Sequence, residues 1–446
     1  MTRFNWLAQA WHGSNRVTRS LLKFPQSTLF APFIASIVGL VFLGRLFGIF
    51  TGPDSYLIYF VGPLGGDASM VKMENIFRKA APRSIDGVPI KFEEIDDSGV
   101  PAKAQRIASR LAADRRTLMV VGHILSSTTK EALAIYMKAD PRIPVILTTE
   151  TNPEILPASD DPDEEFPVFR LSPTDDDQAS SAYAFAIERH ARNFWVVQGS
   201  GNEVYTEYLA NKFLEDAQRN STKVLLVSSV NNSPSAHTIE QLGVQWVFFA
   251  GDWKDGLTLI REVKALHITG IKFILSDGCA SQELLNNGGD DVNDVYVMHQ
   301  LTAEQFNPPK NSHAEDDNHG YGLYATYALA IIDRLLEKAD QRFDQIARED
   351  FWFSHMVHTA LNIHRVSDAR RVLIRCMNRS MGSPFRMSDG KEFRFRKDAT
   401  RERAQFYTWQ IRKHEFTASD TPNPAHAPEQ NLARARTPER LLADAQ

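Results

Sequence analysis

The chain has 446 residues, of which 43% are hydrophobic and 24% charged, a composition typical of globular proteins with two or three domains. Its formal net charge is −5, and because residues 1–53 contribute +5, the remainder carries −10. An acidic domain of this kind is not expected to bind nucleic acid. The only cysteines are Cys279 and Cys376, which excludes a disulfide framework and a thiolate zinc site.

An apolar segment lies near the N-terminus. Residues 27–44 carry no charge, and residues 46–50 continue the run past Arg45, which is long enough to span a bilayer. We predict one transmembrane helix within residues 27–50; a cleaved signal peptide is the alternative, although no small-x-small site follows the run. Four basic residues precede it, which predicts a single-pass protein of the inner (cytoplasmic) membrane with its N-terminus inside and its main domain periplasmic or extracellular.

Strand and helix patterns alternate after this segment, which predicts parallel sheets covered by helices. A strand at residues 56–61 leads into the glycine-rich turn 62–66, followed by a helix at 70–80, a strand at 90–95 and a helix beginning at Pro101. The turn fits neither a phosphate-binding loop nor a dinucleotide fingerprint. We therefore expect its glycines to allow close approach to a small ligand, and we expect no cofactor.

A hydroxyl-rich turn follows the next strand, residues 118–121. Residues 126–129 read Ser-Ser-Thr-Thr and begin a helix, and Thr128 with Glu131 fits a capping box. The unpaired N–H groups of a helix N-terminus and these hydroxyls would together hold a small anion such as a carboxylate. The alternative is that the four residues only cap the helix.

A second strand at 145–147 ends in the polar turn 148–152. With the pieces GHILSSTT and TNPEI in this order, the sequence resembles the substrate-binding proteins of branched-chain amino-acid transporters, which have the type I periplasmic-binding-protein fold. The resemblance runs from about residue 55 to about residue 411. No single motif is decisive, and the order of the motifs is the specific signal.

A second series of units begins near residue 169. Strands are predicted at 194–197, 224–227, 246–250, 273–275 and 295–298; a helix at 321–341 should return to the first lobe, and residues 384–411, with Asp389-Gly390 as a hairpin turn, should cross again. This gives an α/β protein with two doubly wound lobes and a three-crossing hinge that closes on ligand. The expected parts are the N-terminus and anchor 1–53, lobe 1 at 54–168 plus 301–385, lobe 2 at 169–300 plus 386–415, and a disordered tail at 416–446.

The resemblance implies five ligand-binding residues. Ser126 matches the serine that receives the ligand carboxylate, and Thr151 the threonine that contacts its α-amino and carboxylate groups. Tyr205 matches a tyrosine of the other lobe, Trp253 an aromatic side-chain contact, and Asp277 the acidic residue that pairs with the ligand ammonium. Hydroxyls for an anion, a carboxylate for a cation and aromatic walls form a coherent set.

Each of these residues also has a simpler interpretation. Tyr205 lies at helical spacing with Leu209 and Phe213, so it equally fits a core position. Trp253 equally fits a hinge lining, and Asp277 a turn or a helix cap.

Glu150 departs from the family pattern, which has small residues around positions 148–151. If it points into the cleft, its charge would repel a carboxylate beside Ser126 and favour a cationic or amide ligand. We therefore include Glu150 among the predicted ligand-binding residues.

Catalysis and metal binding have little support in the sequence. His123 lies three residues from Ser126, but no G-x-S-x-G motif surrounds a serine. Two histidine groups could hold a metal: His313 and His319 with Glu315, Asp316 and Asp317, and His355 with His358. A solvated loop explains the first group better, and a helix face the second. We therefore predict neither an enzyme nor a metal site.

These patterns predict an extracytoplasmic solute-binding protein that closes on a small amino-acid-like or amide ligand for ABC import, with an ABC permease as partner. The alternative is a membrane-anchored ligand sensor that passes its closure to a partner subunit. A hydrolase or a structural role ranks third.

Overall fold

The computed structural model describes residues 53–65, 68–156, 167–302, 305, 320–361, 364–387 and 389–419. The predicted transmembrane segment, residues 27–50, lies outside these ranges. Within the described ranges, no helix combines the length and the apolar character that crossing a bilayer requires.

The first sheet has six strands in the order β2-β3-β1-β4-β5-β6. All neighbouring strands are parallel except β2, which is antiparallel to β3, so the sheet is mixed where the sequence predicts a parallel one. β6, where the sequence places the start of the second lobe, pairs with β5 in this first sheet. The strands are β1 Tyr56–Gly62, β2 Arg83–Ile85, β3 Val88–Asp96, β4 Thr117–Gly122, β5 Val145–Leu147 and β6 Val168–Arg170.

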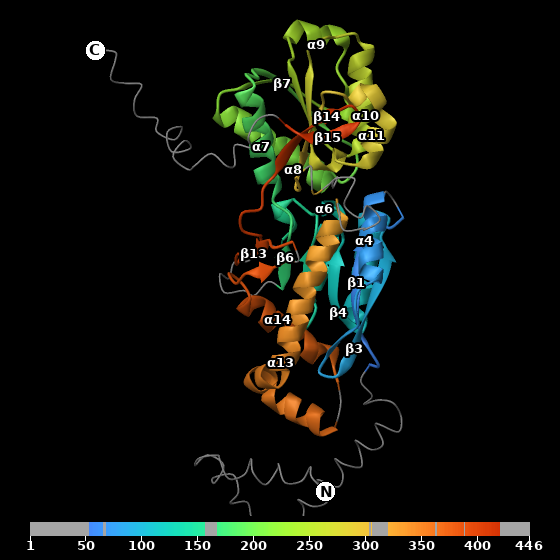
Figure 1. The fold of residues 1–446 in the computed structure, drawn as a ribbon, viewed down its shortest axis with the longest axis vertical. Coiled ribbons are helices and arrows are strands. Elements are labelled where there is room, and N and C mark those ends of the chain that lie inside the picture. The colour runs from blue at the N-terminus through green and yellow to red at the C-terminus, as the bar shows by residue number, and fades with distance from the viewer. Residues whose placement is uncertain are drawn as a thin grey trace, which may run out of the picture. The chain divides into compact units, whose positions relative to one another are not determined.

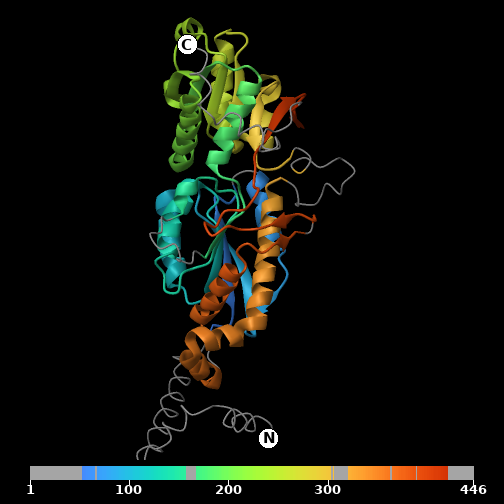
Figure 2. The same cartoon turned by 90° about the vertical axis from the view of Figure 1, so that its left-hand side faces the viewer.

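Helices cover both faces of the first sheet (Figure 2), so successive residues of its strands are buried on opposite sides. In β1, Leu57 and Tyr59 belong to the core on the side of α5 and α6, whereas Ile58 and Phe60 belong to the core on the side of α4 and α13. The helices are α4 Ala68–Arg78, α5 Pro101–Ala113, α6 Ser126–Tyr136, the short η1 Pro153–Ile155, α13 Gly322–Leu361, which leaves helical geometry at Phe351, and α14 Val366–Arg379.

The second sheet has seven strands in the order β15-β14-β11-β10-β9-β7-β8. Its central strands are parallel, while β14 is antiparallel to β11 and β15 is antiparallel to β14, so this sheet is also mixed. The strands are β7 Asn193–Gln198, β8 Lys223–Ser229, β9 Trp246–Ala250, β10 Lys272–Leu275, β11 Tyr296–His299, β14 Tyr407–Arg412 and β15 Glu415–Ala418. The prediction of a disordered tail from residue 416 is wrong for residues 416–418, because they belong to β15, where Phe416 is buried against Trp409.

The second sheet is likewise sandwiched between helices, with α7 and α8 on one face and α10 and α11 on the other (Figure 1). In β7, Phe194 and Val196 pack toward α7 and α8, and Trp195 and Val197 pack on the opposite face. The helices are α7 Asp175–Glu188, α8 Glu203–Arg219, η2 Val230–Asn232, α9 Ala236–Leu242, α10 Trp253–Ala265, η3 Asp277–Cys279, α11 Gln282–Gly288 and η4 Gly289–Val292.

The chain passes between the two sheets three times: after β6, after β11 and before β14. The predicted hairpin precedes the third passage and pairs β12 Phe385–Arg386 with β13 Glu392–Phe393. Its turn contains Gly390 at φ 82°, a backbone conformation that glycine adopts without strain, and the Lys391 N–H donates to Asp389 Oδ1 at 3.1 Å. The carboxyl ends of the parallel strands, where open α/β sheets bind ligands, are the place to look for a site.

Candidate ligand-binding site

The N-terminus of α6 follows β4, as the sequence predicts, but it is not capped as predicted. The N-cap residue is Leu125, which makes no side-chain cap hydrogen bond. The Thr128 hydroxyl instead donates to the carbonyl oxygens of Leu125 and His123 at 3.0 and 3.2 Å. The capping box with Glu131 is therefore absent, and residues 126–129 are all buried.

The hydroxyl groups of this turn have different surroundings. The Ser127 N–H donates to Asn202 Oδ1 at 2.9 Å, and the Ser127 hydroxyl accepts from the Val204 N–H at 3.2 Å, so the start of α8 occupies part of the helix N-terminus. The Ser126 hydroxyl, in contrast, makes no hydrogen bond within the described residues, although Ser126 is only 2% exposed. Ser126 thus keeps a hydroxyl group that is available to a ligand.

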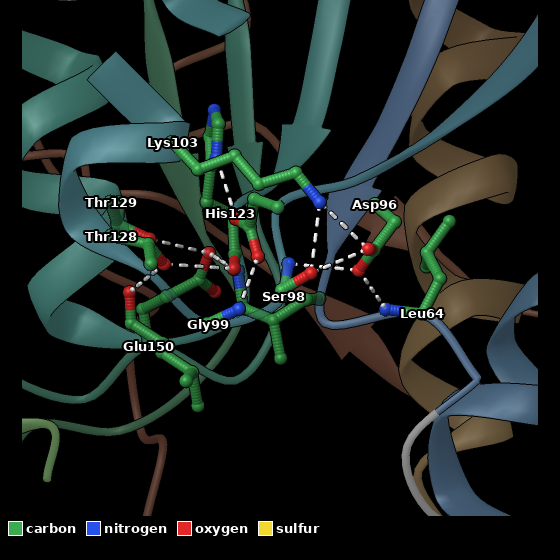
Figure 3. A network of polar contacts seen from close by, with 12 residues as sticks. Leu64, Asp96, Ser98, Gly99, Lys103, His123, Thr128, Thr129 and Glu150 are labelled. Atoms are coloured by element: carbon green, nitrogen blue, oxygen red, sulfur yellow. Dashed lines mark hydrogen bonds and ion pairs between the residues drawn. The ribbon is translucent and has the colours of Figure 1, made fainter. Parts of the chain in front are cut away.

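Glu150, considered above as a cleft residue, points toward backbone N–H groups of its own lobe (Figure 3). Its carboxylate accepts hydrogen bonds from the N–H groups of Ile124 and Thr149, both at 2.9 Å, and lies 3.3 Å from the Thr129 hydroxyl. Burial raises the pKa of this carboxyl, and the backbone hydrogen bonds oppose that shift. Glu150 therefore joins the loop before α6 to the end of β5, and its charge is directed into the lobe.

His123 lies in the same network and is fully buried (Figure 3). Asp97 Oδ2 is 2.9 Å from His123 Nδ1, and the Tyr136 hydroxyl is 2.9 Å from Nε2. Both ring nitrogens are thus engaged in contacts that connect β3, β4 and α6. Close to this network, partial burial raises the pKa of Asp96, but hydrogen bonds from Lys103 and Ser98 together outweigh that effect and lower the pKa to about 2.

Asp277 is the centre of a polar cluster at the carboxyl ends of β10 and β11. Its Oδ1 accepts from the Tyr205 hydroxyl at 2.6 Å and from Gln178 Nε2 at 2.7 Å, and its Oδ2 accepts from Gln300 Nε2 at 2.7 Å. Burial is the main cause that raises the pKa of Asp277, and these three hydrogen bonds oppose it. The structure therefore brings together Tyr205 and Asp277, and it adds two glutamines that the sequence reasoning missed.

Asp175 is a second carboxylate that the sequence reasoning missed. It is the first residue of α7, follows the carboxyl end of β6 and is fully buried, whereas Asp176 and Asp177 are exposed. Its N–H donates to the Thr151 carbonyl at 2.9 Å, but neither carboxylate oxygen accepts a hydrogen bond within the described residues. The signal was present in the sequence as three consecutive aspartates after Thr174, a pattern that also fits an ordinary helix start.

The charge of Asp175 is strongly disfavoured in the folded protein. Burial and the neighbouring charge of Asp277 raise its pKa well above the ordinary aspartate value, while the nearby Thr151 and Arg170 side chains oppose that shift. Arg170 itself is buried and donates from Nη2 to the Asn152 carbonyl at 2.8 Å, and no ion pair joins it to Asp175. Asp175, which lies beside Thr151, and the nearby Asp277 thus form no ion pair within the described residues.

Trp253 is not part of this cluster in the contacts that the structure describes. It is the first residue of α10, packs partly buried against the core, and has Lys254 Nζ 5.6 Å from its ring centroid.

Within the described ranges there is no group of three or more His, Cys, Asp or Glu side chains that could hold a metal ion. The second histidine pair includes His358, whose side chain lies outside the described residues, as do His313 and His319.

Two α/β lobes joined by three chain crossings, with polar side chains at the strand ends, define a two-lobed ligand-binding protein. The family model for periplasmic binding proteins matches residues 60–400, and the chain belongs to this family.

The chain is also similar to two curated relatives, and its fold is similar to that of solved structures. The chain is 26% identical over 274 residues to a leucine-, isoleucine-, valine-, threonine- and alanine-binding protein of Pseudomonas aeruginosa, covering 58% of this chain and 69% of that protein. It is 25% identical over 215 residues to an amino acid binding protein of the same organism, covering 47% of this chain and 55% of that one. The fold is similar to that of the leucine binding protein LivK of Thermotoga maritima, with a TM-score of 0.62, 15% identity, and coverage of 83% of this chain and 99% of that one.

Proposed function

We propose that the protein is an extracytoplasmic solute-binding protein that closes on a small amino-acid-like or amide ligand for ABC import. The observation that carries this proposal is the pair of buried carboxylates, Asp175 and Asp277. Both follow strand ends, and neither forms an ion pair with a lysine or arginine in the described part of the chain. Such a pair is costly unless a positive group arrives to offset it.

The charges indicate which end of a ligand would be held where. An ammonium or amide N–H group beside Asp175 would supply the hydrogen bonds that its oxygens lack and would reduce its repulsion with Asp277. The Ser126 hydroxyl would serve a carboxylate or carbonyl oxygen at the N-terminus of α6. Because Glu150 is directed toward backbone N–H groups, its charge no longer argues against an ordinary amino acid.

The relatives named above support the amino-acid class of ligand through their own names, and the family supports a main domain outside the cytoplasm.

Residues 27–50 would then anchor the domain to the inner membrane, which is supported by the uncharged run and the basic residues before it. A retained anchor also suits the second candidate, a ligand sensor that passes its closure to a membrane partner. Alkaline extraction of membranes from cells that express the tagged full-length protein tests the anchor: it should stay in the pellet, and release into the soluble fraction would contradict this part of the proposal.

A thermal-shift screen of the full-length protein, purified in mild detergent, tests the binding function. Amino acids, amides and small organic acids form the panel, and a ligand at about a hundred times its dissociation constant should stabilise the protein by roughly 2.7 kcal/mol. We expect hits among compounds with an ammonium or amide group. A panel with no hit, or hits that are unaffected by Asp277→Asn, would contradict the proposal.

A further inference from the structure

A polar cavity shares Gln300 with the cluster of Asp277. It has a volume of about 440 Å³ and is lined by the segments through which the chain connects its two sheets. Gln300, Leu301 and Gln305 follow β11, Tyr327 comes from α13, Tyr407 is the first residue of β14, and the remaining lining residues lie within residues 391–405. This connecting-segment pocket is large enough for a small organic molecule.

The pocket is positively charged, in contrast to the site around Asp175 and Asp277. Its described lining contains four basic residues, Lys391, Arg394, Arg401 and Arg403, and two acidic ones, Glu392 and Glu402. Glu392 is already paired, with Arg386 at 2.9 Å and with Arg394 at 3.8 Å. The pocket therefore has more positive charge than its own carboxylates neutralise.

Arg401 is the residue that most clearly lacks a partner. Its Nε atom is buried and donates to no acceptor, and its side chain forms no ion pair within the described residues. Its guanidinium carbon lies 4.3 Å from the ring centroid of Phe393, and burial lowers its pKa. Arg401 as a whole is partly exposed, but a buried Nε atom of a charged group without an acceptor is costly.

Lys391 provides a second cation at the rim of the pocket. Its side chain is 44% exposed and forms an ion pair with Asp389, with Nζ 3.8 Å from Oδ2. That same Asp389 oxygen accepts from the Tyr327 hydroxyl at 2.6 Å. Partial burial lowers the Lys391 pKa, the charge of Asp389 opposes that shift, and the charge of Arg401 adds to it. Lys391 and Arg401 both line the pocket, so both can act on one ligand.

We propose that this pocket is a second binding site, specific for a small oxyanion, a carboxylate or a phosphate, held by the Arg401 guanidinium with Lys391 at the rim. A planar guanidinium binds two oxygens of such an anion at once, and the Tyr327, Phe393 and Tyr407 rings line the space around it. Gln300 touches both sites: its Nε2 donates to Asp277, and its buried Oε1 accepts no hydrogen bond in the described structure. The two sites have opposite charge and so do not compete for the same group.

Isothermal titration calorimetry of the full-length protein with succinate and with inorganic phosphate tests this site, against sodium chloride of matched ionic strength. We expect saturable 1:1 binding of at least one of the two probes, and the probe that binds identifies the anion as a carboxylate or a phosphate. Arg401→Gln should weaken it about tenfold or more, and Lys391→Gln a few-fold. Arg396→Gln, an exposed arginine of the same segment outside the pocket, should bind like the wild type.

The same titration of Asp277→Asn separates this site from the one proposed above. Unchanged anion binding is expected, whereas its loss would mean that both regions hold one ligand, and the proposal of a second site would be wrong. Equal affinity of wild type and Arg401→Gln would also overturn it, as would titrations in which neither probe exceeds sodium chloride. If Arg401→Gln does not fold by circular dichroism, Lys391→Gln decides, because unchanged affinity in that variant contradicts the proposal.

Discussion

Two groups of buried carboxylates lie at strand ends of this protein, and they are stabilised in different ways. Glu150 accepts hydrogen bonds from two backbone N–H groups of its own lobe. Within the described residues, the Asp277 side chain accepts hydrogen bonds from neutral side chains of other elements, and neither oxygen of Asp175 has a hydrogen bond of good geometry, although the Thr151 side chain lies near it. Burial raises the pKa in all three cases, so burial alone does not separate a structural carboxylate from one that is ready for a ligand. The hydrogen-bond partners make that distinction.

The largest expected effect is on ligand binding through Asp277. Asp277→Ala should weaken binding of a hit from the screen by about 2 to 5 kcal/mol, because it removes a charge-assisted contact and leaves a desolvated ligand charge. Calorimetry measures the change. Asp277→Asn separates charge from shape, since its amide keeps a similar volume, and Asp54→Ala removes an exposed aspartate as a control. Wild-type affinity in Asp277→Asn would remove Asp277 from the site.

Glu150→Ala should act on stability. The change leaves the N–H groups of Ile124 and Thr149 buried without an acceptor, which should lower the free energy of unfolding by about 2 to 4 kcal/mol. Urea denaturation followed by circular dichroism measures it, with Glu207→Ala on an exposed face of α8 as the matched control. A stable variant with tighter binding of neutral amino acids would instead mean that Glu150 enters the cleft.

Asp175→Asn should have the opposite effect on stability. Because the folded-state pKa of Asp175 is raised above its unfolded value, the folded protein binds more protons, and its stability falls as pH rises from about 4 through that raised pKa. The variant should lack this fall and should be more stable than the wild type at pH 7 by about 1 to 2 kcal/mol. Melting temperatures of the ligand-free proteins across pH test this; a steeper loss at neutral pH in the variant would contradict it.

Ser126→Ala should have the smallest effect. It removes a hydroxyl that makes no hydrogen bond within the described residues, so stability should be unchanged and binding should weaken by about 1 to 2 kcal/mol. The backbone N–H groups of the α6 N-terminus would still hold the ligand oxygen. The same calorimetry and denaturation experiments apply, and a loss of stability without a loss of affinity would make Ser126 a structural residue.

Much of the fold follows from the sequence because its patterns are local. The run at residues 118–121 and the hydroxyls after it predict the end of β4 and the start of α6, and Asp389-Gly390 predicts the hairpin between β12 and β13. The antiparallel strands β2 and β15 were missed, because short edge strands are defined by their partners. Phe416, placed in the tail by composition, is buried by contact with Trp409.

The site was predicted less completely because it depends on contacts distant in sequence. The pairing of Tyr205 with Asp277 joins residues 72 apart, and the partners Gln178 and Gln300 carry no local signal. Asp175 was hidden within a run that also fits a helix start. The direction of the Glu150 side chain depends on a loop 26 residues earlier, which strand and helix periodicity does not specify.

The central claim is that Asp175 and Asp277 together hold the positive or amide end of one ligand. Calorimetric titration of the strongest hit from the screen into full-length wild type and Asp175→Asn tests it most directly. We predict a stoichiometry of 1:1 for the wild type and an affinity at least about tenfold lower for the variant, which loses a charge-assisted contact while remaining folded. Equal affinity of the two proteins would contradict the claim.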